Sequence, residues 1–144
     1  MRVFIAGIMQ GDRQDRLIDS QDYRLRISHA LQTHIPGVEM VDPWALNPNS
    51  VQYDDQRARD TFITMTKLAS DVDLLIAYLP KPSMGSAMEM WEAYLANVYI
   101  IAVTPLQHHW AIRFTANEVL PDLDTLVADI ENGRIGHILN GRSG

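Results

Sequence analysis

The sequence lacks several features that would indicate particular classes of protein. It contains no cysteine, which excludes disulfide bonds, thiolate metal sites and a cysteine nucleophile, and which fits a reducing compartment. No stretch approaches the roughly 18 apolar residues that a membrane-spanning helix needs. The N-terminal segment 1–13 has one short apolar run and no cleavage pattern of a signal peptide. We therefore expect a cytoplasmic protein that does not interact with a membrane.

Basic residues are too few for a protein that binds a nucleic-acid polymer. The chain has 12 Lys and Arg against 18 Asp and Glu, and its formal charge is −6. Such a surface repels a polyanion, because phosphate contacts need clustered Arg and Lys. A small nucleoside or nucleotide is compatible with this composition, since the charge of one pocket can differ from that of the whole protein.

Apolar runs alternate with helical patterns along the 144 residues, which we interpret as a single domain spanning 1–144. Runs typical of buried strands occupy 2–7, 38–43, 73–80 and 98–105, and helical periodicity occupies 20–35, 55–70, 86–97 and 119–133. This alternation predicts a doubly wound α/β domain with a parallel sheet covered on both faces. Loops that leave the carboxyl ends of the strands should converge on one ligand-binding cleft. These loops are 8–20, 43–54, 80–86 and 104–110.

Glu89 is the candidate for chemistry in this cleft. It follows the turn Ser83-Met84-Gly85-Ser86 at the start of the predicted helix 86–97. The helix dipole favours the ionised carboxylate there, so we expect an anion at neutral pH that can attack an anomeric carbon. The alternative is a solvated surface charge, because Glu is common in the first turn of a helix. Gly85 allows a close turn with free N–H groups, and the two serines can act as helix caps or as ligand contacts.

The segment DLLIAYLPKPSMGSAMEMWEAYLANVYIIAV (73–103) resembles the signature of the nucleoside 2-deoxyribosyltransferase family and of the related 2′-deoxynucleoside 5′-phosphate N-hydrolases. In that signature a strand beginning with Asp leads to a loop and to Gly-x-x-x-Glu at the start of a helix, here Gly85 to Glu89. The run RVFIAG, which ends in Gly7, resembles the first strand of the family.

The resemblance implies a fold, a reaction and an assembly. The fold would be a flavodoxin-like domain with a parallel five-stranded sheet and helices on both faces. Glu89 would attack C1′ of a 2′-deoxynucleoside, expel the base and form a glycosyl-enzyme ester. A free nucleobase, or water, would then take the sugar with retained configuration. No cofactor is implied, and the protein would be a homo-oligomer, a dimer or higher, with shared active sites.

Departures from the family pattern affect the expected substrate and the residue expected to protonate the leaving base. Ser83 stands where the transferases have an aspartate, as in the phosphate-binding hydrolases, and this favours a nucleotide. Gln10 stands where the hydrolases have an arginine, and this favours an uncharged 5′ end. The acid on the helix before the third strand is not matched, so Asp60, about one turn earlier, is our candidate for protonating the leaving base. Phe4 replaces a tyrosine that relatives often carry in the first strand.

Other candidate contacts follow from position. Gly7 and Gly85 are expected to lie at the substrate, and Asp42, Trp44 and Asn47 could contact a base by stacking and hydrogen bonding. Trp44 could equally fill the loop without touching a ligand.

The segment with His108, His109 and Trp110 corresponds to one that reaches the neighbouring subunit's active site in relatives, so we include His109 and Trp110 among the substrate-binding candidates. We expect no metal, because adjacent histidine side chains diverge and no third ligand is evident.

Three functions therefore stay open. The first is base exchange on 2′-deoxynucleosides. The second is hydrolysis of 2′-deoxynucleoside 5′-monophosphates, favoured by Ser83. The third is a module that binds a nucleoside or nucleotide without turnover.

Overall fold

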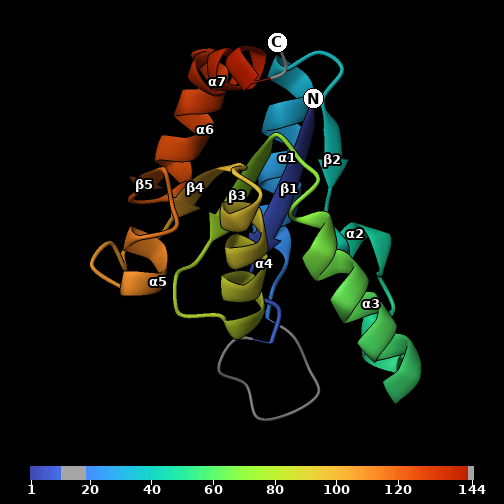
Figure 1. The fold of residues 1–144 in the computed structure, drawn as a ribbon. Coiled ribbons are helices and arrows are strands. Elements are labelled where there is room, and N and C mark those ends of the chain that lie inside the picture. Colours follow the sequence, from blue (N-terminus) through green and yellow to red (C-terminus); the bar gives the residue numbers. More distant parts are fainter. Residues whose placement is uncertain (11–18, 143–144) are drawn as a thin grey trace.

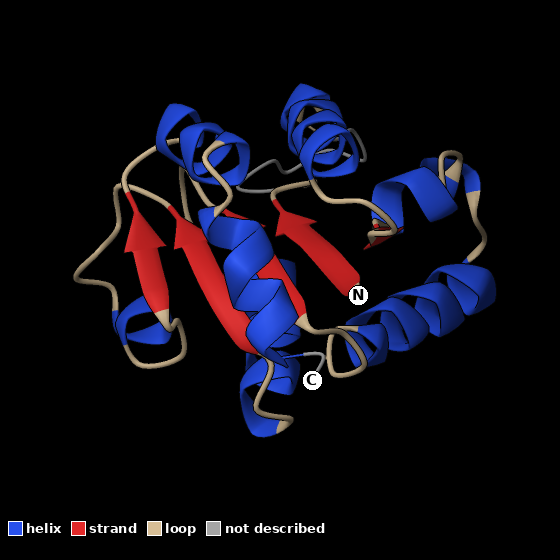
Figure 2. Ribbon diagram, turned by 90° about the horizontal axis from the view of Figure 1, so that it is seen from above, coloured by secondary structure: helices blue, strands red, loops and turns tan. Residues whose placement is uncertain are grey.

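The structure is a computed structural model that describes residues 1–10 and 19–142. Its centre is a parallel sheet in the order β2-β1-β3-β4-β5. Figure 2 shows the strands side by side and pointing the same way, with helices on both sides of the sheet. The strands are β1 (Arg2–Gly7), β2 (Glu39–Val41), β3 (Leu74–Tyr78), β4 (Tyr99–Val103) and β5 (Glu118–Leu120). This five-stranded α/β architecture is flavodoxin-like and confirms the predicted fold class.

Alternate residues of the strands point to opposite faces of the sheet and build two apolar cores. One core joins strand residues such as Ile5 and Ile76 to the helices α1 (Asp22–His34), α6 (Leu123–Glu131) and α7 (Arg134–Arg142). The other core joins Phe4 and Leu75 to the helices α4 (Met84–Leu95) and α5 (Trp110–Arg113). The nearly unbroken apolar runs of the central strands are explained by this burial on both faces.

The connection between β2 and β3 departs from this compact packing. It contains α2 (Pro43–Leu46), the short 3-10 helix η1 (Ser50–Gln52) and α3 (Asp55–Leu68). Figure 1 shows α3 extending away from the sheet. Thr66 is the buried residue of α3, whereas Phe62 and Ile63 are 47% and 44% exposed. The apolar periodicity of 55–70 thus predicted the helix correctly, but it did not predict that these apolar side chains are exposed.

Two sequence-based helix starts were wrong, and the position of the fifth strand was not predicted, for identifiable reasons. Helix α4 begins at Met84 rather than near residue 86, because the Ser83 side chain accepts a hydrogen bond from the backbone N–H of Ser86 and caps the helix. The fifth strand consists of three residues, too few to give a periodic signal. The predicted helix 119–133 therefore starts later than expected, and Gly133, with φ +87°, separates α6 from α7.

The strand order places a topological switch between β1 and β3. The chain continues from β1 to β2 on one side of the sheet and from β3 to β4 on the other. In open parallel sheets, ligands bind beyond the carboxyl ends of the strands at such a point. The ends of β1 and β3, at Gly7 and Tyr78, are paired neighbours.

Candidate active site

A cavity of about 500 Å³ opens beyond the carboxyl end of β1. This volume lies within the range of small-molecule sites. Its walls come from the end of β1, the α2–η1 connection, one side of α3 and the start of α4. The described residues that line it are Gly7, Met9, Gln10, Pro43, Asn47, Ser50, Val51, Tyr53, Asp55, Ala58, Thr61, Phe62, Met65, Thr66, Ser83, Met84, Gly85, Ser86 and Glu89.

Glu89 lies in the wall of this cavity, together with the predicted contacts Gly7, Gln10, Asn47, Ser83 and Gly85. Those residues come from three separate parts of the sequence, and the topology of the sheet brings them to one place. The site therefore contains a carboxyl group, side-chain amides and hydroxyls, and the first turn of a helix.

The protonation of Glu89 differs from the sequence-based expectation. Burial raises the pKa of its carboxyl to about 8, with the nearby charge of Arg24 lowering it and that of Asp42 raising it. Glu89 is the sixth residue of α4, whereas the effect of the helix dipole is confined to the first turn. Loss of hydration thus outweighs the dipole and favours the neutral acid, in contrast to the expected anion.

The start of α4 leaves one polar group for a ligand or for Glu89. Ser83 acts as the helix cap, with a distance of 3.3 Å from its Oγ to the N–H of Ser86. The Oγ of Ser86 is buried and has no hydrogen-bond partner among the described residues. Ser86 precedes Glu89 by three residues, so both lie on the same side of α4. A Cβ added at Gly85 would meet no atom within 4 Å, so the glycine leaves open space at the cavity wall.

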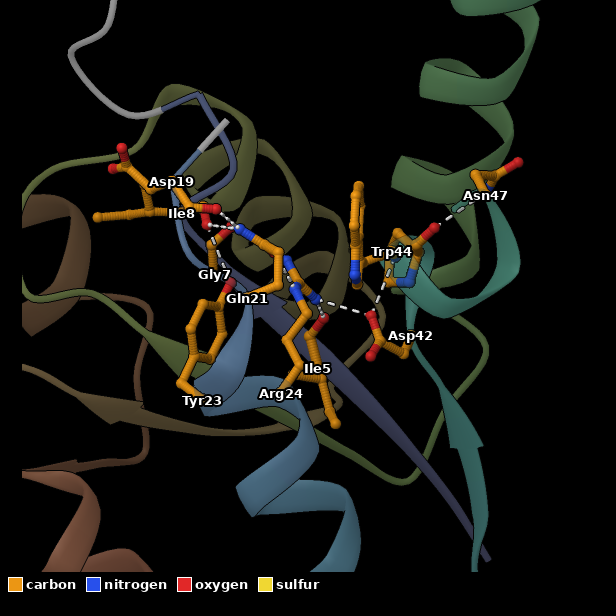
Figure 3. Close-up of polar contacts among 11 residues, drawn as sticks. Ile5, Gly7, Ile8, Asp19, Gln21, Tyr23, Arg24, Asp42, Trp44 and Asn47 are labelled. Carbon is orange, nitrogen blue, oxygen red and sulfur yellow. Dashed lines mark hydrogen bonds and ion pairs between the residues drawn. The ribbon is translucent and has the colours of Figure 1, made fainter. Parts of the chain in front are cut away.

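A buried ion pair lies behind the end of β1, as Figure 3 shows. Nη1 of Arg24 is 2.9 Å from Oδ1 of Asp42, and the two side chains are 2% and 8% exposed. Nη1 also donates to the carbonyl of Ile5 at 2.8 Å, and Nη2 donates to that of Gly7 at 3.3 Å. Nε donates to Oε1 of Gln21 at 2.7 Å. Arg24 thereby holds the last carbonyls of β1, directly behind a residue that lines the cavity.

Gly7 is required by a close contact inside the protein. The hydroxyl of Tyr23 donates to the carbonyl of Ile8 at 3.0 Å. A Cβ at Gly7 would lie 2.3 Å from that hydroxyl oxygen, too close for any side chain. The glycine predicted as a substrate contact therefore also makes room for α1. Burial raises the pKa of Tyr23, so its hydroxyl stays protonated.

Asn47 lines the cavity but is tied into its own loop. Its Nδ2 donates to the carbonyl of Pro43 at 3.1 Å, and its Oδ1 accepts from the hydroxyl of Tyr53 at 3.1 Å. Figure 3 shows Asn47 on the far side of Trp44 from Arg24. This bonding fixes the α2–η1 connection beside the cavity, and it reduces the freedom of the amide to bond a base.

Asp42 and Trp44, two of the sequence-based candidates, are not among the cavity residues. The Asp42 carboxylate is bound by Arg24 and caps α2 by accepting from the N–H of Trp44 at 3.0 Å. In the single chain it therefore bonds within the protein, and a contact between Asp42 and a base stays a prediction. Trp44 is half-buried in the short helix α2.

Asp60, His109 and Trp110 also lie outside this cavity in the single chain. Asp60 is exposed on α3, and its two carboxylate oxygens accept from Nε2 of Gln56 at 3.0 and 3.1 Å. In this position Asp60 does not face Glu89 across the cavity. His109 and Trp110 are exposed at the start of α5, so a role at the site depends on a second subunit.

Several functional residues were missed by the sequence analysis. Arg24 lies three residues before Ile27 and seven before Leu31, on the apolar side of α1. A charge in such a position needs a buried partner, which was the available signal. Phe62 and Met65 line the cavity, and the helical periodicity of 55–70 does not distinguish a core from a cavity wall.

No group of three or more His, Asp or Glu side chains among the described residues is arranged to hold a metal ion. Within residues 1–10 and 19–142, no helix has the length and apolar character required to cross a membrane.

Comparison with known proteins finds similar folds but no similar sequences. No family model matches the chain, and no curated protein matches it in sequence. Among solved structures, the chain is similar to a 2-deoxyribosyltransferase from the psychrotolerant bacterium Bacillus psychrosaccharolyticus, with a TM-score of 0.68, 12% identity and 96% coverage of both chains. It is also similar to a conserved protein from Enterococcus faecalis V583, with a TM-score of 0.62, 16% identity, and coverage of 92% of this chain and 98% of the other.

A third similarity shows that the fold does not fix the chemistry. The apo form of an NADH:FMN oxidoreductase has a TM-score of 0.53 and 9% identity, covering 98% of this chain and 89% of the other. A transferase and an oxidoreductase thus share the architecture with this chain, and function has to be argued from the site itself. At these identities the comparisons establish that the chain has the flavodoxin-like fold found in a 2-deoxyribosyltransferase.

Proposed function

We propose that the protein is a nucleoside 2-deoxyribosyltransferase that exchanges the base of 2′-deoxynucleosides through a covalent intermediate on Glu89. The observation that carries this proposal is the position of the Glu89 carboxyl in a 500 Å³ cavity at the switch between β1 and β3. The carboxylate attacks C1′, the bond from C1′ to the base nitrogen breaks, and the base leaves with a proton. A second base then attacks C1′ of the ester and releases Glu89, so two inversions retain the configuration.

The raised pKa of Glu89 makes the roles of nucleophile and acid distinguishable. A nucleophile must be ionised, so the rate of base exchange should rise with pH as Glu89 loses its proton near pH 8. If Glu89 instead donated a proton to the leaving base, the rate should fall over the same pH range. The initial rate from pH 6 to 9 at subsaturating nucleoside separates these two mechanisms.

Hydrolysis of a 2′-deoxynucleoside 5′-monophosphate is the second candidate. Ser83 lines the cavity beside the first turn of α4, where backbone N–H groups favour an anion. Two observations argue against binding of a phosphate. The described cavity residues include no Lys or Arg, and they include the acidic residues Asp55 and Glu89. Arg13 and Arg16 lie outside the described residues. The described wall of the cavity thus favours a substrate with an uncharged 5′ end.

The mechanism also needs a proton for the leaving base. Asp60, the residue expected to supply it, is hydrogen-bonded to Gln56 on the surface of α3. Asp55 contributes the second carboxyl group among the described residues of the cavity. We propose that Asp55, rather than Asp60, supplies this proton or positions the water that does so.

We also propose that the protein assembles as a homo-oligomer in which the exposed surface around α3, α4 and α5 is covered. Large apolar side chains of these helices are exposed to solvent, and exposed apolar patches mark interaction surfaces. The exposed members on these helices and their ends are Phe62, Ile63, Met84, Met88, Trp91, Tyr94, Leu95, Trp110 and Phe114. Burial of this surface would bring a second subunit beside the cavity wall formed by α3 and α4, and would give His109 and Trp110 a route to a neighbouring site.

One set of incubations tests the function. The protein is incubated with a 2′-deoxynucleoside, or its 5′-monophosphate, with and without a second free base, and the products are separated by chromatography. Base exchange that needs the second base supports the transferase, and release of base without it supports the hydrolase. Tight binding with no base release by either substrate would support a binding module instead. Glu89→Ala should abolish turnover while the fold stays intact, and turnover that persists in this variant would remove the mechanism.

A further inference from the structure

The cavity that contains Glu89 has two chemically different sides. The side formed by the start of α4 carries two serine hydroxyls and the carboxyl of Glu89. The side formed by the α2–η1 connection and α3 also carries large apolar and aromatic side chains, which are Val51, Tyr53, Phe62 and Met65. Val51 and Phe62 are exposed in the single chain, so this apolar surface is not used by the core of the protein.

Tyr53 is held in this wall at its backbone, its hydroxyl and its ring. Its backbone N–H donates to the carbonyl of Ser50 at 3.1 Å, and its hydroxyl donates to Oδ1 of Asn47 at 3.1 Å. The guanidinium carbon of Arg57 lies over the ring, 3.9 Å from its centroid. A cation at this distance is attracted to the face of the ring. The orientation of the ring is therefore fixed before any ligand binds.

The start of α3 explains why Arg57 lies over this ring. Asp54 is the N-cap of α3, and its Oδ1 accepts from the backbone N–H of Arg57 at 2.8 Å. Tyr53 directly precedes this cap, in the position from which a side chain commonly packs on the first turn of the helix. The cap thus brings Arg57 back towards the residue before it, and one local motif builds the pair of Tyr53 and Arg57.

The two residues differ in their relation to the cavity. Tyr53 is half-buried and lines it, whereas Arg57 is exposed and is not among the described lining residues. Arg57 covers one face of the ring from outside the cavity, which leaves the opposite face for a ligand. A preorganised ring loses little conformational entropy when a ligand binds to it.

We propose that the face of Tyr53 opposite Arg57 is the platform on which the nucleobase of the substrate stacks. The place of the base rests on the proposed function. When Glu89 attacks C1′, the base leaves from the other side of that carbon, because the displacement inverts its configuration. The base therefore lies away from α4, on the side of the cavity that carries Tyr53. Stacking uses the aromatic face that every base has, so the platform serves purines and pyrimidines alike.

The test measures the binding of 2-aminopurine 2′-deoxyriboside, whose fluorescence is quenched when its base stacks. The full chain with Glu89→Gln is used throughout, so that the probe is not consumed. Adding Tyr53→Leu should raise Kd about tenfold or more and remove most of the quenching, because leucine fills the space without an aromatic face. Adding Tyr53→Phe should keep Kd within about twofold and keep the quenching, because phenylalanine retains the ring.

The phenylalanine variant also separates stacking from a structural role of Tyr53. It loses the hydrogen bond to Asn47 but not the ring, so an equal rise of Kd in the phenylalanine and leucine variants would overturn the platform. Far-ultraviolet circular dichroism and urea unfolding establish that both variants are folded. A Kd and a quenching that stay unchanged in folded Tyr53→Leu would overturn the proposal as well.

A matched pair of variants on α3 tests the role of Arg57. Arg57→Ala removes the cation from the ring and should raise Kd about threefold. Arg59 is an exposed arginine on the same helix, so Arg59→Ala makes the same change of charge and should leave Kd unchanged. Equal effects of the two variants would mean that net charge, rather than cover of the ring by Arg57, sets the affinity, and would refute this part of the proposal.

The outcomes separate this inference from the proposed function. Binding that depends on the ring of Tyr53, in a protein that shows no base exchange, would establish the platform and refute the enzymatic proposal. Base exchange in the wild type, together with a probe that is not quenched or is quenched equally in Tyr53→Leu, would refute the platform alone.

Discussion

Replacing Glu89 by Gln should change how the stability of the protein depends on pH. Glutamine resembles neutral glutamic acid in shape but does not titrate. Folding raises the pKa of Glu89 from 4.5 to about 8, so between these values the folded state holds a proton that the unfolded state releases. The wild-type free energy of unfolding should therefore be largest below pH 4.5 and should fall as the pH rises towards 8, whereas the variant lacks this contribution.

The size of the effect follows from the displacement of the pKa. Each pH unit within the window corresponds to about 1.4 kcal/mol, or about 5 kcal/mol for the whole displacement. The sequence has a pI of about 5.2, where proteins tend to precipitate, so pH 6 is the practical lower limit. Between pH 6 and 8 the full effect is about 3 kcal/mol, and water in the cavity should reduce it to roughly 2 kcal/mol.

Urea unfolding followed by far-ultraviolet circular dichroism measures this difference. Wild type and Glu89→Gln are unfolded at pH 6, 7, 8 and 9, and the free energy of the variant minus that of the wild type is plotted against pH. All other titrating groups are shared and cancel in this difference. The difference should increase by roughly 2 kcal/mol and then level off above pH 8. Parallel curves for the two folded proteins would instead show that Glu89 ionises at its ordinary pKa.

Three further predictions follow from the cavity and the surface. Gly85→Ala should raise the unfolding free energy by up to about 1 kcal/mol, because alanine favours a helix and its methyl group meets open space. The same variant should raise KM for the nucleoside, because Gly85 lines the cavity. Gly141→Ala in α7 is the control, with KM unchanged, and equal KM values for both variants would place the substrate elsewhere. Asp55→Asn should lower kcat at least tenfold while Asp60→Asn leaves it within twofold, and the reverse order would restore Asp60 as the acid. Trp91→Glu on α4 should shift the mass measured by light scattering towards the monomer, and an unchanged mass would place the interface on another surface.

The sequence predicted the elements whose signals are local. The strands β1, β3 and β4 are nearly all apolar because they are buried on both faces, and such runs are visible without any knowledge of the fold. The convergence of Gly7, Gln10, Asn47, Ser83 and Glu89 on one cavity followed from the rule that ligands bind at the carboxyl ends of parallel strands. Site position was thus predictable once the sheet was predicted.

The features that the sequence did not predict depend on contacts between residues that are far apart in the sequence. The ionisation of Glu89 is governed by burial and by Arg24 and Asp42, which precede it by 65 and 47 residues. The local signal, a carboxyl near the start of a helix, indicated the opposite protonation. Asp42 was interpreted as a base contact because it follows a strand, but the guanidinium of Arg24 binds it from another element.

The proposed covalent bond between Glu89 and the sugar is tested by mass spectrometry of the digested protein. The protein is mixed with a 2′-deoxynucleoside in the absence of an acceptor base at pH 8, quenched in acid and digested. The account predicts a deoxyribosyl adduct on the peptide that contains Glu89, absent from Glu89→Gln and removed when a free base is added before the quench. Base exchange that proceeds at full rate with no adduct on that peptide, or with an adduct on another residue, would contradict it.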